Sequence, residues 1–222
     1  MKLEHRTQTS QSIAHDYNFY MLFWVFVLFS VFGFCFESLA NLIEYGEFHN
    51  RQGILYLPFS QVYGLGAIVI IEATRWIKTK NLGVLFVFCA IFGAFFEYVV
   101  SYIEEMVLHS TTWDYSNMPF NIDGRTNLLF SLAWGAVGVL IVKVLFPLSV
   151  KVIDRIRGKS GLVVTWFIFI ILAGDILLSS AMVYRAYERR NAIPATNVVQ
   201  EFLDKYYPDS VVFKTYPSLR FK

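Results

Sequence analysis

Two glutamates occupy matching places in two long apolar stretches of the chain. Glu37 follows Gly33 by four positions, and Glu97 follows Gly93 by the same four. Because a carboxylate at membrane depth costs roughly 3 kcal/mol or more, such residues usually face a bundle interior or a watery cavity. Three roles are open for this pair: holding an interrupted backbone or a loop arginine in place, binding a ligand or handling protons, and acid/base chemistry.

Each glutamate belongs to a polar stripe with the same spacing. Intervals of 4, 4 and 3 residues separate the members of each stripe, which places them on one helix face. The stripes are Gly33, Glu37, Asn41 and Glu44, and Gly93, Glu97, Ser101 and Glu104. The glycines in them favour close helix contact over the approach of a ligand.

The stripes are part of an internal duplication. One block repeats at an offset of 60 and a second at an offset of 71, so an 11-residue insertion falls between Glu105 and Phe120. Identical pairs are Phe32/Phe92, Gly33/Gly93, Phe36/Phe96, Glu37/Glu97, Ile43/Ile103 and Glu44/Glu104, then Asn50/Asn121, Gly53/Gly124, Leu57/Leu128, Phe59/Phe130, Ser60/Ser131, Gly64/Gly135 and Ile70/Ile141. The repeat units cover about 32–76 and 92–148. Such duplications often bracket the functional site of a membrane protein.

The elements that carry these residues are membrane helices. The chain is 56% hydrophobic and 18% aromatic, and five apolar stretches approach the roughly 20 residues that cross a bilayer. They are Tyr17–Leu42, Ile54–Trp76, Leu82–Leu108, Leu128–Leu148 and Leu162–Tyr184. We predict an all-α integral membrane protein with a five-helix domain over 17–187. Since each repeat unit holds two spans, helices 1–2 and 3–4 should form a parallel pseudo-twofold repeat about the membrane normal, which superposes the two carboxylates.

The distribution of Lys and Arg predicts the orientation. Nine of these residues fall on the side of the N-terminus and five on the other side, and positive charge favours the cytoplasm. We therefore expect a cytoplasmic segment 1–16 and an extracytoplasmic tail 188–222. In the tail, Thr196 is a candidate N-cap of a short amphipathic helix that ends before Pro208, and this helix either folds over the outer loops or lies on lipid.

The second block has the composition of an interrupted helix entry. Pro58 removes a backbone donor, and Gly64 and Gly66 weaken the helix. Leu129 replaces this proline in the second copy. Non-helical backbone at such depth requires protein or a water-lined cavity to satisfy it. Asp175, alone in the unduplicated fifth span, either completes that cavity or pairs with a partner subunit.

This topology gathers one set of polar and aromatic residues at the outer face. The candidate ligand-binding or cavity residues are Glu37, Asn41, Arg51, Tyr56, Gln61, Tyr63, Glu97, Ser101, Trp113, Asp114, Asn121 and Arg125. Arg51 and Arg125 are in the first and third loops, so one of them should reach a stripe carboxylate. Trp113 is an equal candidate for lining the site and for packing in a lid.

At these residues the chain resembles the bacterial membrane proteins called putative ABC-transporter type IV. The resemblance covers about Phe32 to Lys143. It rests on Glu37, Gly53, Tyr56, Pro58 and Phe59, on Tyr63-Gly64-Leu65-Gly66-Ala67, on Phe96-Glu97-Tyr98, on Trp113-Asp114-Tyr115-Ser116 and on Pro119-Phe120-Asn121 with Gly124-Arg125. Ser60-Gln61 departs from the proline expected there. The resemblance implies a multi-pass protein of the bacterial plasma membrane with a transport label.

Three functional classes follow. We favour a small permease-like or substrate-binding subunit with an outward-facing polar cavity; the alternatives are a membrane-embedded enzyme acting on a lipid or cell-envelope substrate, and an accessory scaffold. Expected partners are membrane lipid, a small-molecule or lipid ligand, and a separate ATPase or envelope subunit, because the sequence has no Walker-type loop. A net charge of +2 does not suggest nucleic acid. His5, His15, His49 and His109 lack metal-ligand spacing, and we expect no metal or cofactor.

Overall fold

The computed structural model describes residues 19–48 and 50–222. The expected cytoplasmic segment 1–16 and His49 lie outside this range, and so does the side chain of Glu44.

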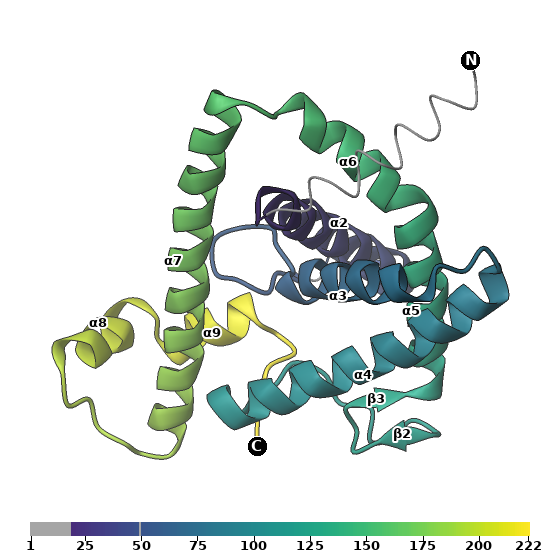
Figure 1. The fold of residues 1–222 in the computed structure, drawn as a ribbon. Coiled ribbons are helices and arrows are strands. Elements are labelled where there is room, and N and C mark those ends of the chain that lie inside the picture. The colour runs from purple at the N-terminus through teal and green to yellow at the C-terminus, as the bar shows by residue number, and fades with distance from the viewer. Residues whose placement is uncertain (1–18, 49) are drawn as a thin grey trace.

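The described part of the protein is helical, with four helices long and apolar enough to cross a membrane (Figure 1). α2 (Phe19–Tyr45), α4 (Leu82–Leu108) and α7 (Lys159–Arg190) are three of them. The fourth is a rod of three parts, in which α5 (Leu128–Leu140) continues through the π-helix η1 (Ile141–Leu145) into α6 (Phe146–Arg155). The prediction of an all-α membrane protein is thus confirmed.

The second predicted span differs from its expected bounds. α3 begins at Gln61 and ends at Ile77, so its 17 residues extend only about 25 Å, less than the hydrocarbon core of a bilayer. Residues 54–60, which we expected to be helical, are not. Pro58 explains the difference, because proline has no amide donor and disfavours helical geometry before it.

The segment before α3 enters the helix bundle instead of running over its surface. The Ser60 amide donates to the carbonyl of Ser30, near the middle of α2, at 3.1 Å. Ile54 and Phe59 are buried and pack with Phe23 and Leu172 in one core cluster. The start of α3 therefore lies at the depth of the centre of α2, and residues 50–60 form a re-entrant segment.

Equivalent contacts hold α3 against α2 and α5 against α4. A Cβ atom on Gly33 would overlap the Tyr63 ring, and a Cβ on Gly93 would overlap Trp134. Gly64 similarly meets Phe26 of α2, and Gly135 meets Phe86 of α4. In each case the partners are related by the offsets of 60 and 71 in the sequence. The glycines of the stripes thus allow close helix contact, as expected.

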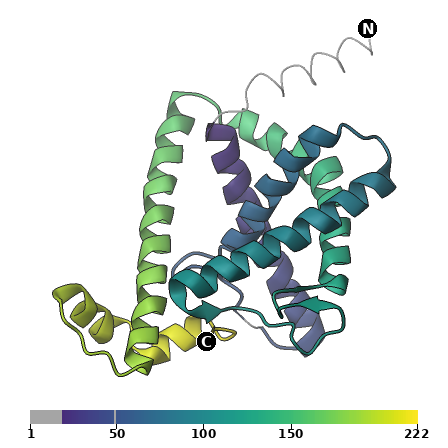
Figure 2. The same cartoon turned by 60° about the horizontal axis from the view of Figure 1, so that its bottom comes forward.

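The molecule has two distinct ends (Figure 2). At one end, the Tyr20 hydroxyl near the start of α2 donates to the carbonyl of Ile156 after α6, at 2.9 Å. The other, which we call the loop end, holds the C-terminus of the protein and the antiparallel pair of β2 (Asn121–Ile122) with β3 (Thr126–Asn127).

The C-terminal tail folds back on the loop end. It contains α8 (Val198–Tyr206), α9 (Asp209–Thr215) and β4 (Arg220–Phe221), and β4 pairs with β1 (Ser110–Thr111) after α4. α8 ends before Pro208 as predicted, but its N-cap is Asn197, whose side chain accepts from the Gln200 amide. The prediction of Thr196 was wrong by one residue. The tail contacts the loops through β4 and Ser218, whereas α8, the helix expected over the loops or on lipid, packs against α7.

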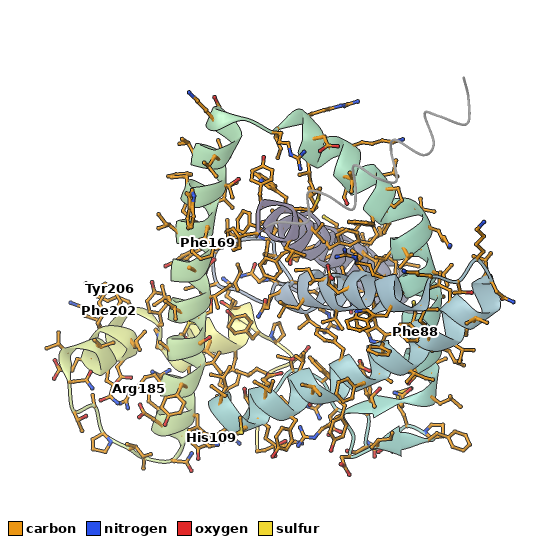
Figure 3. The ribbon with its side chains drawn as sticks, viewed as in Figure 1. Phe88, His109, Phe169, Arg185, Phe202 and Tyr206 are labelled. Carbon is orange, nitrogen blue, oxygen red and sulfur yellow. The ribbon has the colours of Figure 1, made fainter. Side chains whose placement is uncertain are left out.

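The tail is attached to α7 by ion pairs as well as apolar contacts. Arg185 of α7, labelled in Figure 3, is buried and pairs with Asp204 of α8 at 2.8 Å. Arg189 pairs with the same carboxylate at 2.7 Å. These two guanidinium groups lower the pKa of Asp204 from 3.8 to about 2. Phe202 and Tyr206 of α8, also labelled in Figure 3, remain substantially exposed.

Candidate functional site

Glu37 lies beside the arginine of the first loop. Arg51 Nε is 4.0 Å from Glu37 Oε1, and both side chains are about two-thirds buried, with 28% and 32% exposed. The same guanidinium donates to Asn41 Oδ1 at 2.7 Å and to Ser218 Oγ at 2.8 Å. Arg51 therefore joins the first stripe to the C-terminal tail, and the expected contact between a loop arginine and a stripe carboxylate is present.

Glu97 is more deeply buried, with 6% of its surface exposed. Its two oxygens accept hydrogen bonds from the hydroxyls of Tyr115 at 3.0 Å and Thr126 at 2.8 Å. The Trp134 indole is also close to this carboxylate. Burial and the adjacent negative charge raise the pKa of Tyr115, which keeps its hydroxyl protonated as a donor. All three of these groups are neutral, so they do not compensate a charge on Glu97.

Tyr63, at the start of α3, connects the two glutamates. Its hydroxyl lies within electrostatic range of both carboxylates. Its ring packs on Gly33 of one stripe and lies 6.3 Å from the Trp134 ring, which packs on Gly93 of the other. Glu37, Tyr63, Glu97 and Tyr115 thus form one cluster between the two helix pairs, which we call the acid–tyrosine cluster.

Arg125 contacts the second stripe without reaching Glu97. It donates to Glu105 Oε2 at 2.7 Å and to Ser101 Oγ at 3.2 Å. Glu104 is near the C-terminal end of α4, where the Thr112 hydroxyl donates to it at 3.1 Å. Ser101 and Asn41 are equivalent stripe positions, so each loop arginine contacts the third residue of its own stripe.

The polar aromatic loop is organised mainly by its own hydrogen bonds. Trp113 Nε1 donates to the backbone carbonyl of Arg125 at 2.8 Å, and Asn121 Nδ2 donates to the backbone carbonyl of Met118 at 2.7 Å. Asp114 accepts from the Ser116 amide at 2.9 Å, and the Ser116 contacts lower the pKa of Asp114. Three of the predicted site residues, Trp113, Asp114 and Asn121, therefore shape the loop, while Tyr115 is the member that reaches the cluster.

The remaining candidates lie at the first loop. Gln61 Nε2 donates to the carbonyl of Gly53 at 3.0 Å, which closes the re-entrant segment onto α3. The Tyr56 hydroxyl is 2.6 Å from that of Tyr207 in the tail, away from the cluster. The Tyr56 contact raises the pKa of Tyr207 to about 12.

Asp175 has a role that the sequence did not indicate. Its two oxygens accept from the backbone amides of Leu55 and Tyr56, both at 3.0 Å, and Oδ1 also accepts from Ser179 at 3.2 Å. Asp175 is buried near the middle of α7. It supplies acceptors to amides of the re-entrant segment that have no helical partner.

Sequence reasoning missed Tyr115, Thr126 and Trp134 as neighbours of Glu97. Tyr115 belongs to the Trp-Asp-Tyr-Ser run, and Trp134 is the counterpart of Tyr63 at the offset of 71, so both carried a signal. Thr126 had none, because only the β2–β3 turn places its hydroxyl beside α4.

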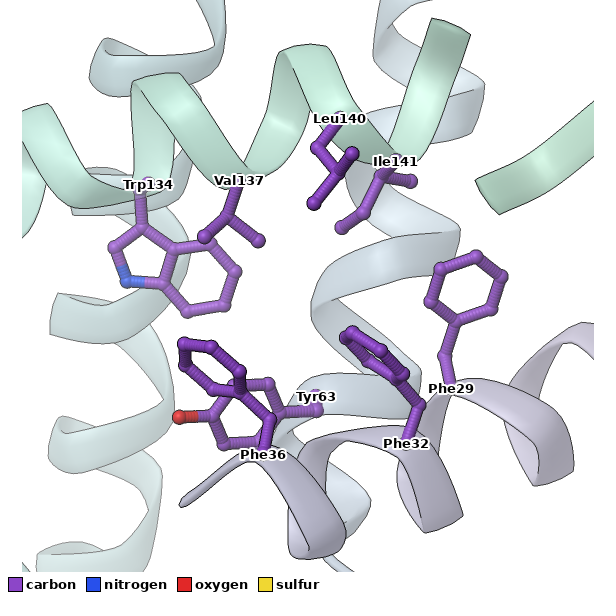
Figure 4. Close-up of a pocket in the computed structure, with 8 residues that line it drawn as sticks. All are labelled: Phe29, Phe32, Phe36, Tyr63, Trp134, Val137, Leu140 and Ile141. Carbon is purple, nitrogen blue, oxygen red and sulfur yellow. The ribbon is translucent and has the colours of Figure 1, made fainter. Parts of the chain in front are cut away.

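An apolar groove adjoins the cluster (Figure 4). It runs between α2 and the α5–η1 rod and has Tyr63 of α3 at its base. Its lining consists of Phe29, Phe32, Phe36, Tyr63, Trp134, Val137, Leu140 and Ile141. Phe29 and Ile141 are buried, while Phe32, Phe36 and Leu140 are 41%, 50% and 43% exposed and form the rim. The groove therefore opens on the protein surface between α2 and the α5–η1 rod. Over the described residues, no three His, Cys, Asp or Glu side chains are arranged to hold a metal ion.

Comparison with known proteins identifies a family. The model of a family described as Putative ABC-transporter type IV matches residues 24–180. Neither the curated proteins nor the solved structures include a significant match to this sequence. The matched range contains the whole acid–tyrosine cluster and Asp175, and it ends before the tail.

Proposed function

Because the protein belongs to the Putative ABC-transporter type IV family, we propose that it is a permease-like, substrate-binding membrane subunit whose site is the acid–tyrosine cluster. The observation that carries this proposal is the position of Tyr63, whose ring packs on Gly33 of one stripe and lies 6.3 Å from the Trp134 ring, which packs on Gly93 of the other. A buried carboxylate whose described donors are all neutral is costly unless it serves a ligand or a proton.

The architecture that fits this role consists of two related units around the cluster. We propose that α2–α3 and α4–α5 are copies related by an axis along the membrane normal, since Gly33 and Gly93 contact equivalent partners. α3 then acts as a fifth membrane-embedded helix that returns the backbone from mid-depth. With the basic residues of the α3–α4 and α6–α7 connections inside, the loop end faces outward.

Access to the site from outside requires the tail to move. Arg51 is bound to Ser218 of the tail, and Glu105 accepts from Lys222 Nζ at 3.1 Å as well as from Arg125. The last five residues therefore bind the hydrogen-bond networks of both loop arginines. We propose that this is a closed form of the site and that release of residues 218–222 uncovers the polar side of the cluster.

Energy for transport would come from another protein. The sequence contains no Gly-rich loop ending in Gly-Lys-Ser/Thr, so ATP hydrolysis falls to a separate subunit. The exposed basic residues in the second half of α6, such as Lys151 and Arg155, lie on the side where a cytoplasmic ATPase would bind in this orientation.

The test compares solute contents of cells that lack the protein with cells that express it. We expect a set of solutes to change when the native protein is supplied and to stay unchanged when Glu37→Gln or Glu97→Gln is supplied at equal membrane levels. Glu72→Gln is the matched control, because Glu72 pairs with Arg75 on the surface at 3.1 Å. Full restoration by both cluster variants would overturn the proposal.

A further inference from the structure

Glu97 is next to the apolar groove, because Trp134 lines the groove and its indole is close to this carboxylate. Tyr63 and Trp134 line the groove, and the same two side chains border the acid–tyrosine cluster. Figure 4 shows the Tyr63 hydroxyl directed away from Leu140 and Ile141 at the opposite end of the groove. A molecule seated on the apolar lining would therefore place one end beside the carboxylates.

The apolar part selects a hydrocarbon tail. Apart from Tyr63 and Trp134, every lining side chain is a hydrocarbon, and a polar solute bound there would lose hydration without gaining hydrogen bonds. The exposed rim, formed by Phe32, Phe36 and Leu140, belongs to two helices that meet the criteria for spanning a membrane. A hydrocarbon tail can thus enter from the bilayer without crossing water.

The π-helix marks the same place independently. η1 begins at Ile141, on the wall of the groove, and π-helical turns in α-helices frequently occur at functional sites. The widened turn interrupts the rod formed by α5 and α6 where this wall is built. A continuous α-helix would present a different set of side chains to the groove beyond this point.

The polar end selects a positive charge. Glu97 accepts hydrogen bonds from two neutral hydroxyls, whereas Glu37 already has Arg51 at 4.0 Å. Within residues 19–48 and 50–222, the Tyr63 hydroxyl has no hydrogen-bond partner. A carboxylate close to a tryptophan and a tyrosine is a combination that binds alkylammonium groups. An anionic head would be repelled by Glu97, and a neutral one would leave its charge uncompensated.

We propose that the groove and Glu97 together bind an amphipathic cation, with its hydrocarbon tail against Phe36, Val137 and Leu140 and its ammonium group between Tyr63, Trp134 and Glu97. This assignment rests on the proposed function, because it names the class of ligand for the acid–tyrosine cluster. Lipids with an amine head and free alkylamines share this chemistry.

Two probes with hydrocarbon tails of similar length and opposite charge test the assignment. Purified full-length protein in a maltoside detergent is titrated with dodecyltrimethylammonium or with dodecanoate, and bound probe is counted by native mass spectrometry. We expect one dodecyltrimethylammonium per protein molecule, bound about tenfold more tightly than dodecanoate, and we expect Glu97→Gln to remove this preference. Equal binding of both probes to the native protein would overturn the proposal.

A second pair of variants tests the groove itself. Leu140→Trp fills it and should abolish binding of dodecyltrimethylammonium. Leu148→Trp is the matched control, because Leu148 is 50% exposed, against 43% for Leu140, and does not line the groove. This variant should bind dodecyltrimethylammonium as the native protein does. Unchanged binding to Leu140→Trp would refute the site.

A failure of the ligand assignment can be distinguished from a failure of the proposed transport role. If the solute contents of cells depend on Glu97 but the two probes bind equally, the ligand class is wrong and the role of the subunit stands. If the cationic probe binds as expected but the solute contents do not depend on Glu97, the binding site stands and the transport role is wrong.

Discussion

The Asp175 side chain accepts a hydrogen bond from the backbone amide of Leu55, 120 residues earlier in the sequence, at 3.0 Å. One carboxylate in the middle of α7 thereby satisfies two amides of the re-entrant segment, since Tyr56 donates to its other oxygen. This contact fixes the position from which α3 begins, and α3 carries Tyr63 into the acid–tyrosine cluster.

Asp175→Asn should destabilise the protein by about 1–3 kcal/mol, because the amide nitrogen of asparagine would face a buried N–H donor. The midpoint of thermal unfolding in detergent should fall accordingly. Asp154→Asn is the control, since its partner Arg157 is 3.7 Å away and both side chains are exposed, and this change should have little effect. Equal midpoints for the two variants would contradict the anchoring role of Asp175.

Gly33→Ala and Gly93→Ala should each destabilise the protein by about 1–3 kcal/mol, because the added methyl groups would overlap Tyr63 and Trp134. Similar losses at both positions are expected from equivalent packing. Gly174→Ala is the matched control: no atom lies within 4 Å of the added Cβ, and the helix should gain up to about 1 kcal/mol. The changes in stability are measured by thermal unfolding of the three variants. An unchanged unfolding midpoint for Gly93→Ala would argue against the tight helix contact.

Removal of residues 218–222 should uncover the loop end. Thr111, 2% exposed and paired with Arg220, provides the reporter when replaced by cysteine in a protein that lacks Cys35 and Cys89. An impermeant maleimide added to intact cells should label Thr111→Cys faster after truncation. Asn117→Cys, in the exposed part of the same loop, should be labelled equally with and without the tail. Protection of Thr111→Cys in the truncated protein would exclude the tail as a cover.

Attachment of the tail to α7 should weaken in acid. The pKa of Asp204 is lowered from 3.8 to about 2 by Arg185 and Arg189, so its ionised form is stabilised in the folded protein. This contribution is fully present above about pH 4 and is lost as the pH falls toward 2. The difference in unfolding midpoint between the native protein and Asp204→Asn should be constant above pH 4 and shrink below it. A difference independent of pH would contradict the ion pairs.

The positions of the long helices could be predicted because burial in a bilayer imposes a length of apolar sequence. The predicted span Leu82–Leu108 agrees with α4 at both ends, whereas the predicted spans that start at Leu128 and Leu162 are shorter than the observed helices. Their helices continue to Arg155 and Arg190, where charged residues extend beyond the apolar region without ending the helix. Hydropathy marks the membrane boundary and not the helix terminus.

The site was predictable only in part, for the same physical reason. Helical spacing placed Glu37 with Asn41 and Glu97 with Ser101, because contacts within a helix follow from sequence separation. The partners of Glu97 on the third loop depend on how a turn folds, and the Asp175 contact depends on the packing of α7. Arg125 was expected to be a candidate for a stripe carboxylate and instead pairs with Glu105, one residue beyond the stripe.

The most direct test of the central claim is a pair of quantities measured on Glu97→Gln. Glutamine keeps the shape of the side chain. Its carbonyl oxygen can accept from one of the Tyr115 and Thr126 hydroxyls, and its amide group can donate to the other after that hydroxyl rotates, so the unfolding midpoint should stay close to that of the native protein. If the acid–tyrosine cluster is the binding site, this stable variant should fail to restore the solute contents that depend on the protein. A variant that is stable and fully restores them would contradict the account, and so would one whose loss of activity only follows its loss of folded protein.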